Sequence, residues 1–71
     1  MKIAIIDDVT MTAEQEERLR RYGDLVVFTG VPTRPGEILS RGAGAQILIA
    51  SWTKINAQIL ENLTQLKLIS I

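Results

Sequence analysis

Two adjacent acidic residues are the first group in this sequence whose type and spacing could do chemistry. Asp7 and Asp8 directly follow the apolar segment 3–6. Paired carboxylates supply the hard oxygen ligands that Mg²⁺ prefers, and a magnesium ion held there could assist phosphoryl transfer. The same position also suits a turn at the end of a strand or a helix cap, because short acidic side chains accept hydrogen bonds from nearby backbone N–H groups. We expect the structural role for Asp7.

A second candidate group follows the apolar segment 47–50. Ser51 and Thr53 could donate hydrogen bonds to a ligand, and Trp52 could cover an apolar face of it. Ligands of open α/β sheets bind beyond the carboxyl ends of the strands, where these residues would lie. The structural alternative, which we favour, is that Thr53 or Asn56 caps the following helix while Trp52 packs against a neighbouring element.

Several groups that usually carry catalysis or bind cofactors are missing from the sequence. The chain has neither histidine nor cysteine, so it lacks an imidazole for acid/base work, a structural zinc site and disulfides. A dinucleotide-binding turn has the pattern G-x-G-x-x-G between a strand and a helix. The sequence has only Gly42-Ala43-Gly44, which precedes an apolar segment and indicates a helix end. We therefore assign no catalytic, cofactor-binding or metal-binding residue.

The charge balance argues against nucleic acid and membrane surfaces as partners. Eight basic and eight acidic residues cancel, so no net field attracts either. The densest basic cluster follows an acidic one at i,i+4 spacing, which favours ion pairs on a solvated helix face; the members are Glu14, Glu16, Glu17, Arg18, Arg20 and Arg21. No apolar run approaches the ~20 residues of a membrane span, and segment 3–6 is too short for a signal peptide. We expect a soluble, cytoplasmic protein.

Four short apolar segments must form the framework that positions these residues. They are 3–6, 25–28, 47–50 and 68–71, and each is mostly β-branched without polar alternation. Strands buried on both faces have this pattern, and such strands are typical of parallel sheets. The sequence therefore predicts four parallel strands.

The polar segments between them predict three helices. The first is expected to begin at Thr12, which has a glutamine three residues later as in a capping box, and to end before Gly23 as its C′ residue. The second is expected over 35–41 with a cap at Thr33, and the third after the N-cap Asn56. The side chains expected to face inward are Ala13, Leu19, Tyr22, Ile38, Leu39, Ile59, Leu60 and Leu63.

The alternation of strands and helices predicts an α/β fold with right-handed crossovers. We expect a flavodoxin-like parallel sheet of strand order 2-1-3-4 with three helices. A chain of 71 residues makes at most one small domain. The last segment has no helix after it to cover its second face, so we interpret the fold as incomplete at its C-terminus.

Two stretches narrow the choice of family. Ser51–Asn56, SWTKIN, resembles the S-x-T-K-[VI]-[TN] segment that enters the third helix of D-isomer-specific 2-hydroxyacid dehydrogenases. Leu63–Ile71, LTQLKLISI, is similar to the LPxLKLIS run into that family's fourth strand. The segment 1–8 resembles the opening of several flavodoxin-like domains. The segments 24–27 and 43–49 also lie at the distances expected for the dehydrogenase family, although that family more often has an acidic residue at the position of Gln46. The resemblance covers the whole chain but only the first part of the family's sequence.

The resemblance implies that residues 1–71 are the N-terminal part of the substrate-binding lobe of an NAD(P)-dependent 2-hydroxyacid dehydrogenase, with the cofactor-binding domain absent. It implies a 2-hydroxy or 2-keto acid as substrate of the full-length enzyme, and a pocket wall at Ser51, Trp52 and Thr53. The family's catalytic arginine, glutamate and histidine lie downstream of the matching region. No residue of this chain is therefore assigned one of these three roles, and we do not expect the chain to be active alone.

Two other functions remain open. A stand-alone α/β module could associate with itself, because its fourth strand would present an open edge and an uncovered face. Response-regulator receiver domains also begin with a strand ending in paired acids, but their phosphoacceptor aspartate follows the third strand. Ser51 stands there, and no aspartate follows Asp24, so only a degenerate receiver domain is compatible. The expected partner is therefore a second copy of the chain or the remainder of the enzyme.

Overall fold

Four parallel strands form a single sheet in the computed structural model, which describes residues 1–70. The elements in chain order are β1 (Lys2–Ile5), α1 (Ala13–Arg20), β2 (Asp24–Val27), α2 (Pro35–Gly42), β3 (Ile47–Ile49), α3 (Ala57–Asn62) and β4 (Leu68–Ser70). The strand order is β2-β1-β3-β4. The predicted α/β class, element order and strand order are confirmed. Ile71, the last residue of the fourth apolar segment, lies outside the described residues.

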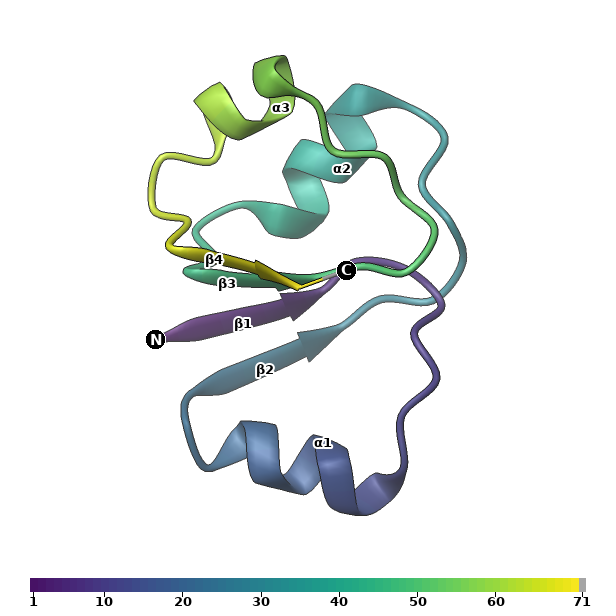
Figure 1. Cartoon of the computed structure of the whole chain (residues 1–71), viewed down its shortest axis with the longest axis vertical. Coiled ribbons are helices and arrows are strands. Elements are labelled where there is room, and N and C mark those ends of the chain that lie inside the picture. The colour runs from purple at the N-terminus through teal and green to yellow at the C-terminus, as the bar shows by residue number, and fades with distance from the viewer. Residues whose placement is uncertain (71) are drawn as a thin grey trace.

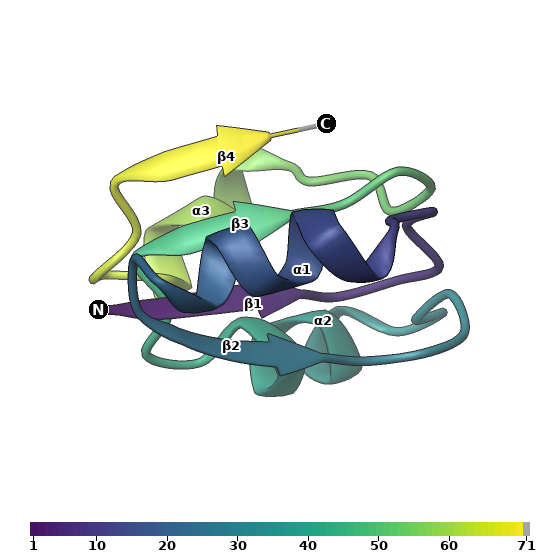
Figure 2. The ribbon, with the colours of Figure 1, turned by 90° about the horizontal axis from the view of Figure 1, so that it is seen from below.

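The helices cover the two faces of the sheet unequally. Figure 1 shows α2 and α3 together on one face and α1 alone on the other. Seen from the α1 side, β4 has no described helix in front of it (Figure 2). One face is therefore covered along most of its width, whereas the other is covered over part of it.

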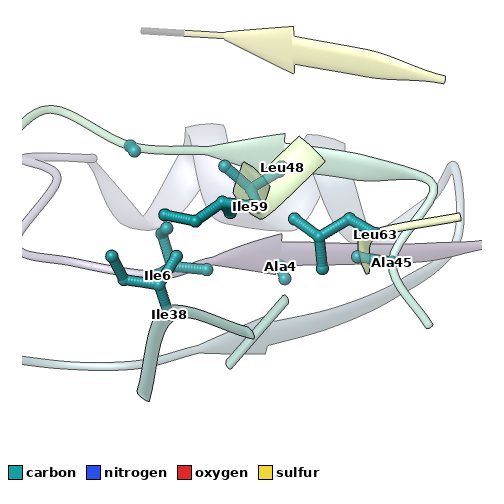
Figure 3. Packing of buried hydrophobic residues seen from close by; sticks show 8 residues of the cluster. Ala4, Ile6, Ile38, Ala45, Leu48, Ile59 and Leu63 are labelled. Atoms are coloured by element: carbon teal, nitrogen blue, oxygen red, sulfur yellow. The ribbon is translucent and has the colours of Figure 1, made fainter. Parts of the chain in front are cut away.

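The hydrophobic core lies between the sheet and the α2–α3 layer (Figure 3). Successive side chains of a strand point to opposite faces, so Ala4 and Ile6 enter this core while Ile3 and Ile5 face α1. All four are at most 1% exposed. The cluster consists of Ala4, Ile6, Ile38, Ala45, Leu48, Ala50, Ile59 and Leu63. The central strand β1 is thus buried on both faces, as predicted.

The edge strand β2 is less buried than predicted. In β2, Asp24 and Val27 are exposed, and Leu25 and Val26 are half-buried. The reason is that β2 is an edge strand and α1, which lies beside it, has no buried residue. The expectation that this segment would be buried on both faces was wrong.

The first helix begins as predicted but packs differently. The Thr12 hydroxyl accepts a hydrogen bond from Gln15 N at 3.1 Å, and Thr12 N donates to Gln15 Oε1 at 3.0 Å, which completes the capping box. Leu19 is half-buried, but Ala13 and Tyr22 are exposed, so two of the three predicted inward residues were wrong. The exposed face carries the predicted i,i+4 ion pairs, Glu14–Arg18, Glu16–Arg20 and Glu17–Arg21.

The glycine that follows α1 has another role than the predicted one. Gly23 does not adopt the left-handed conformation of a C′ residue, unlike Gly30 and Gly44. Instead, a Cβ atom at this position would collide with the carbonyl oxygen of Met1. Gly23 lets the chain entering β2 pass close to the start of β1.

Of the N-caps predicted for the other two helices, the one for α2 was wrong and the one for α3 is confirmed. The N-cap of α2 is Arg34, which makes no side-chain capping bond, rather than Thr33. Pro35 explains this, because proline forces the preceding residue into extended conformation and itself starts the helix. The N-cap of α3 is Asn56, as predicted, and its Oδ1 accepts from Ile59 N at 2.9 Å.

The predicted inward faces of α2 and α3 are confirmed except at one residue. Ile38, Ile59 and Leu63 are buried, and Leu39 is partly buried against the core. Leu60 is 41% exposed, so its inward assignment was wrong. With only six residues, α3 turns too little of its surface toward the sheet to bury it. None of the helices within residues 1–70 is long and apolar enough to span a membrane.

Candidate functional site

Three loops meet at the carboxyl ends of β1, β2 and β3, because parallel strands present these ends at one edge of the sheet. The β1–α1 loop contains Asp7 and Asp8, the β2–α2 loop contains Gly30, and the β3–α3 loop contains Ser51. Such edges are where open α/β sheets bind ligands. We take this edge as the candidate functional site.

The Asp7 side chain fastens the β3–α3 loop to the end of β1. Its Oδ1 accepts a hydrogen bond from Ser51 N at 2.9 Å. Its Oδ2 accepts from Trp52 N at 2.9 Å, from Thr53 N at 2.9 Å and from the Thr53 hydroxyl at 2.7 Å. Asp7 is only 1% exposed, so a carboxylate is buried here with both oxygens satisfied. A buried charge is tolerated when it is hydrogen-bonded in this way.

The environment of Asp7 keeps the carboxylate ionised. Burial raises the pKa of Asp7, since it disfavours the charged form. The hydrogen bonds from the backbone of the loop and from the Thr53 hydroxyl act in the opposite direction and outweigh burial. The net result is a pKa of Asp7 below its ordinary value, so the acceptor role is maintained at neutral pH.

Asp8 connects the same edge to the β2–α2 loop. Its Oδ1 accepts a hydrogen bond from Gly30 N at 2.7 Å, and its carbonyl oxygen accepts from the indole Nε1 of Trp52 at 3.2 Å. Gly30 has a φ of 77°, a conformation that most side chains disfavour. Asp8 therefore has two roles. It holds the turn at Gly30, a position that favours glycine, and it holds the indole N–H end of the Trp52 ring.

Arg41 of α2 completes the connections. Its Nη1 donates to the carbonyl oxygens of Ile6 and Gly30, each at 2.8 Å, and its Nη2 pairs with Glu37 at 3.0 Å. The guanidinium carbon also lies 5.4 Å from the centre of the Phe28 ring, within cation–π range. Arg41 thus ties α2 to β1 and to the β2–α2 loop. Sequence reasoning missed this residue, and only its i,i+4 spacing from Glu37 could have drawn attention to it.

The structure places the three predicted pocket residues in different environments. Thr53 is 7% exposed, and its hydroxyl and backbone N–H groups already donate hydrogen bonds to Asp7. Trp52 is 68% exposed, and Ser51 is exposed at the sheet edge. The structural alternative is confirmed for the cap, because Asn56 caps α3, but it was wrong for Trp52, which is not packed under another element. Ser51 and Trp52 are the two that a ligand could reach.

Ser51 also borders a cavity of about 420 Å³ between α1 and the end of β3. This volume falls in the range of small-molecule sites. The lining combines apolar side chains with hydroxyl, amide and guanidinium groups; it comprises Val9, Thr10, Met11, Gln15, Arg18, Leu19, Ile49, Ala50 and Ser51. Its lining includes Gln15, Arg18 and Leu19 of α1, so the cavity lies on the α1 side of the sheet. Figure 2 shows that α1 covers this side only in part. An open, largely apolar hollow of this kind can receive a small ligand or a side chain of another segment.

Phosphoryl chemistry does not fit this edge. Both oxygens of Asp7 are used by hydrogen bonds from the β3–α3 loop, which leaves them poorly placed to bind magnesium. Asp7 is instead the structural residue that we expected, although it holds a distant loop rather than its own turn. Within residues 1–70, no three acidic side chains gather as a metal site.

A dinucleotide site does not fit the described residues either. Gly42 is the last residue of α2, Ala43 is its C-cap, and Gly44 has a φ of 74°. The predicted helix end is confirmed. This turn leads from a helix into a strand and lies at the amino end of β3, opposite the edge described above. A phosphate-binding turn has the reverse order, from strand to helix.

Comparison with known proteins identifies a reductase with the same fold. No protein-family model and no curated protein matches the sequence. Among solved structures, the chain is similar to the acyclic imino acid reductase Bsp5, solved in complex with NADPH and D-Arg, with a TM-score of 0.85 and 31% sequence identity. The match covers 97% of this chain and 22% of the reductase chain. The chain therefore shares the fold of part of an NADPH-binding reductase and spans less than a quarter of its length.

Proposed function

We propose that this chain forms the N-terminal part of the substrate-binding lobe of an NAD(P)-dependent 2-hydroxyacid dehydrogenase or a closely related reductase. The observation that carries the proposal is the position of Ser51–Asn56. This segment leaves β3 at the carboxyl edge and enters α3, in a fold that matches an NADPH-bound reductase over 97% of the chain. The dehydrogenase-like sequence and the ligand-binding edge of the sheet therefore coincide.

The substrate class follows from chemistry shared by the two kinds of enzyme. A 2-keto acid or a 2-imino acid accepts a hydride at C2 from a reduced nicotinamide and a proton at its oxygen or nitrogen. The products are a 2-hydroxy or a 2-amino acid and the oxidised nicotinamide. In this proposal Ser51 and Trp52 form part of the wall around the substrate, while cofactor, acid/base group and carboxylate-binding arginine come from outside the described residues.

The partner in this proposal is the remainder of the reductase. On the α1 side, β4 has no described helix in front of it, and its outer edge is unpaired among residues 1–70. Further secondary structure could pack there. A second copy of the chain is the competing occupant, and sedimentation at increasing concentration distinguishes the two: growth from monomer to dimer would favour self-association.

A chimeric enzyme tests the proposed function directly. This chain would replace the matching 22% of the imino acid reductase, and NADPH oxidation would be followed with imino and keto acids. We expect the chimera to fold and turn over, and Trp52→Ala to lower its kcat/KM by roughly tenfold, the effect of one lost aromatic contact. Tyr22→Ala is the matched control, because Tyr22 is equally exposed but lies after α1, away from the site.

Three results would contradict the proposal. One is a folded chimera without activity towards any 2-keto or 2-imino acid. Another is an equal loss of kcat/KM for Trp52→Ala and Tyr22→Ala. The chain alone should not oxidise NADH or NADPH with glyoxylate, pyruvate or hydroxypyruvate, and measurable turnover would show that the assignment of roles is wrong.

A further inference from the structure

The start of the β3–α3 loop has the form of an anion-binding site. The N–H groups of Ser51, Trp52 and Thr53 and the Thr53 hydroxyl all donate to one carboxylate at 2.7–2.9 Å. Successive backbone N–H groups that converge in this way form a concavity that binds anions in many proteins. Here the bound anion is the side chain of Asp7, which arrives from β1.

We propose that residues 51–53 form an anion cradle that is occupied by the Asp7 carboxylate of the same chain. In this proposal Asp7 is a positioning residue for the candidate ligand-binding edge. By occupying the cradle, Asp7 turns the N–H groups of the loop inward. The groups left for a ligand are the Ser51 hydroxyl and the Trp52 ring. The cradle itself stands independently of the proposed function, whereas its consequence for the ligand rests on that function.

Burial and hydrogen bonding support this arrangement. Asp7 is 1% exposed and Thr53 is 7% exposed, so water competes little for their hydrogen bonds. Among the described residues, no buried side-chain nitrogen or oxygen lacks a partner. The site is therefore complete with Asp7 in place, and removing the carboxylate would leave several inward donors without an acceptor.

The cradle also affects the orientation of the exposed Trp52 side chain. Its backbone N–H donates to Asp7 and its indole N–H donates to the Asp8 carbonyl, yet the residue is 68% exposed. An exposed aromatic side chain held at its backbone and at its indole N–H loses less conformational freedom when a ligand binds than a free one does. We infer that the ring is presented in a fixed orientation as a contact surface.

The cradle also restricts how a substrate can bind. Since the N–H groups of the loop already hold Asp7, they cannot bind the substrate carboxylate. The loop instead meets the substituent beyond C2 through an aromatic face and one hydroxyl. Changes in Ser51 and Trp52 should therefore alter the preference among side chains of the substrate, while the requirement for a carboxylate should be unchanged.

Chemical rescue tests the cradle in the 71-residue chain. Asp7→Ala removes the carboxylate and leaves a space that formate fits. We expect this variant to lose melting temperature and to show an altered emission of Trp52, the single tryptophan of the chain. Formate should restore both properties with a saturable dependence on concentration, whereas methylformamide, which is neutral, should not.

Matched variants make the result decisive. Asp8→Ala removes a carboxylate that accepts from a single N–H group, that of Gly30, so formate should have no saturable effect on it or on the wild type. If Asp7→Ala does not fold without formate, the circular dichroism of the same titration reports the rescue. Lack of rescue, or equal rescue of Asp8→Ala, would overturn the cradle. Asp7→Asn with wild-type emission and melting temperature would also overturn it.

The consequence for the ligand is tested separately in the chimeric reductase. Ser51→Ala and Trp52→Ala should change the ratio of kcat/KM between substrates with short and long side chains at least fivefold. An unchanged ratio, together with successful formate rescue, would refute the ligand role and leave the cradle intact. An inactive chimera with successful rescue would refute only the proposed function.

Discussion

The Thr53 hydroxyl donates a hydrogen bond of 2.7 Å to Asp7 Oδ2, although the two residues are 46 positions apart in the chain. Both are buried. The bond exists because β1 and β3 are neighbours in the sheet, which brings the residues after each strand to the same edge. It joins the end of the first strand to the loop that carries the candidate ligand-contacting residues, so stability and function should be coupled at this point.

Acidification should weaken the fold through Asp7. Its pKa in the folded protein lies below the value in the unfolded chain, which is about 3.9. The unfolded state therefore binds the proton first, and the stabilisation is fully present above about pH 4 and is lost as pH falls through the folded-state pKa. Urea unfolding at a series of pH values should show a smaller loss on acidification for Asp7→Asn than for the wild type. Identical pH dependence of Asp7→Asn and the wild type would refute the prediction.

Two glycine substitutions should have opposite effects on stability. Gly23→Ala places a methyl group against the carbonyl oxygen of Met1, so the start of β1 must move, and we expect a loss of about 1–3 kcal/mol. Gly36→Ala, in the first turn of α2, meets no atom within 4 Å and has no left-handed φ. It should stabilise the fold by about 0.4–1 kcal/mol, because alanine restricts the unfolded chain. Chemical denaturation of both variants measures the difference, and a loss for Gly36→Ala would contradict this account.

Replacement of Arg41 by lysine should destabilise the fold although the charge is kept. One guanidinium nitrogen of Arg41 bridges the carbonyl oxygens of Ile6 and Gly30, while a lysine ammonium is a point charge on a different stem. We expect a loss of about 1–3 kcal/mol. Arg18→Lys is the control, since the Arg18 guanidinium forms an exposed pair with Glu14, and it should change stability by less than about 0.5 kcal/mol. Equal effects in thermal melts would show that Arg41 has no bridging role.

The contribution of the α3 N-cap to the free energy of unfolding should also be measurable. Asn56→Ala removes the acceptor of the Ile59 N–H group and should cost about 0.5–2 kcal/mol. Asn62 lies at the other end of the same helix and donates to the Gln58 carbonyl at an exposed position. Asn62→Ala should therefore change the free energy of unfolding by less than about 0.5 kcal/mol. If the two substitutions cost the same, the cap does not determine the start of the helix.

Sequence reasoning predicted the features that depend on local patterns. The short apolar segments, the capping box at Thr12 and the cap at Asn56 are confirmed because each is encoded within a few residues. The strand order is confirmed because the alternation of strands and helices leaves few parallel arrangements. Burial was predicted less well: Tyr22, which follows α1, and Leu60 of α3 are both exposed although we expected them to face the sheet.

The candidate site could be predicted only as a location. The residues Ser51 and Trp52 were expected at the carboxyl edge and lie there, but the role of Asp7 depends on partners 44 to 46 positions away. Nothing within its local sequence distinguishes a carboxylate that caps its own turn from one that holds a distant loop. The same is true of Arg41, whose acceptor on β1 is 35 positions away.

The strand order has a consequence for the way the sheet is built during synthesis. β1 emerges first and occupies an inner position; β2 joins one of its edges, β3 the other, and β4 then joins β3. Every strand can therefore be added to an edge that already exists, and none has to be inserted between two paired strands. Addition of one strand at a time leaves an open edge at each stage, and among the described residues the outer sides of β2 and β4 are both open edges. A protein that continues this sheet needs only to supply the next strand at one of them.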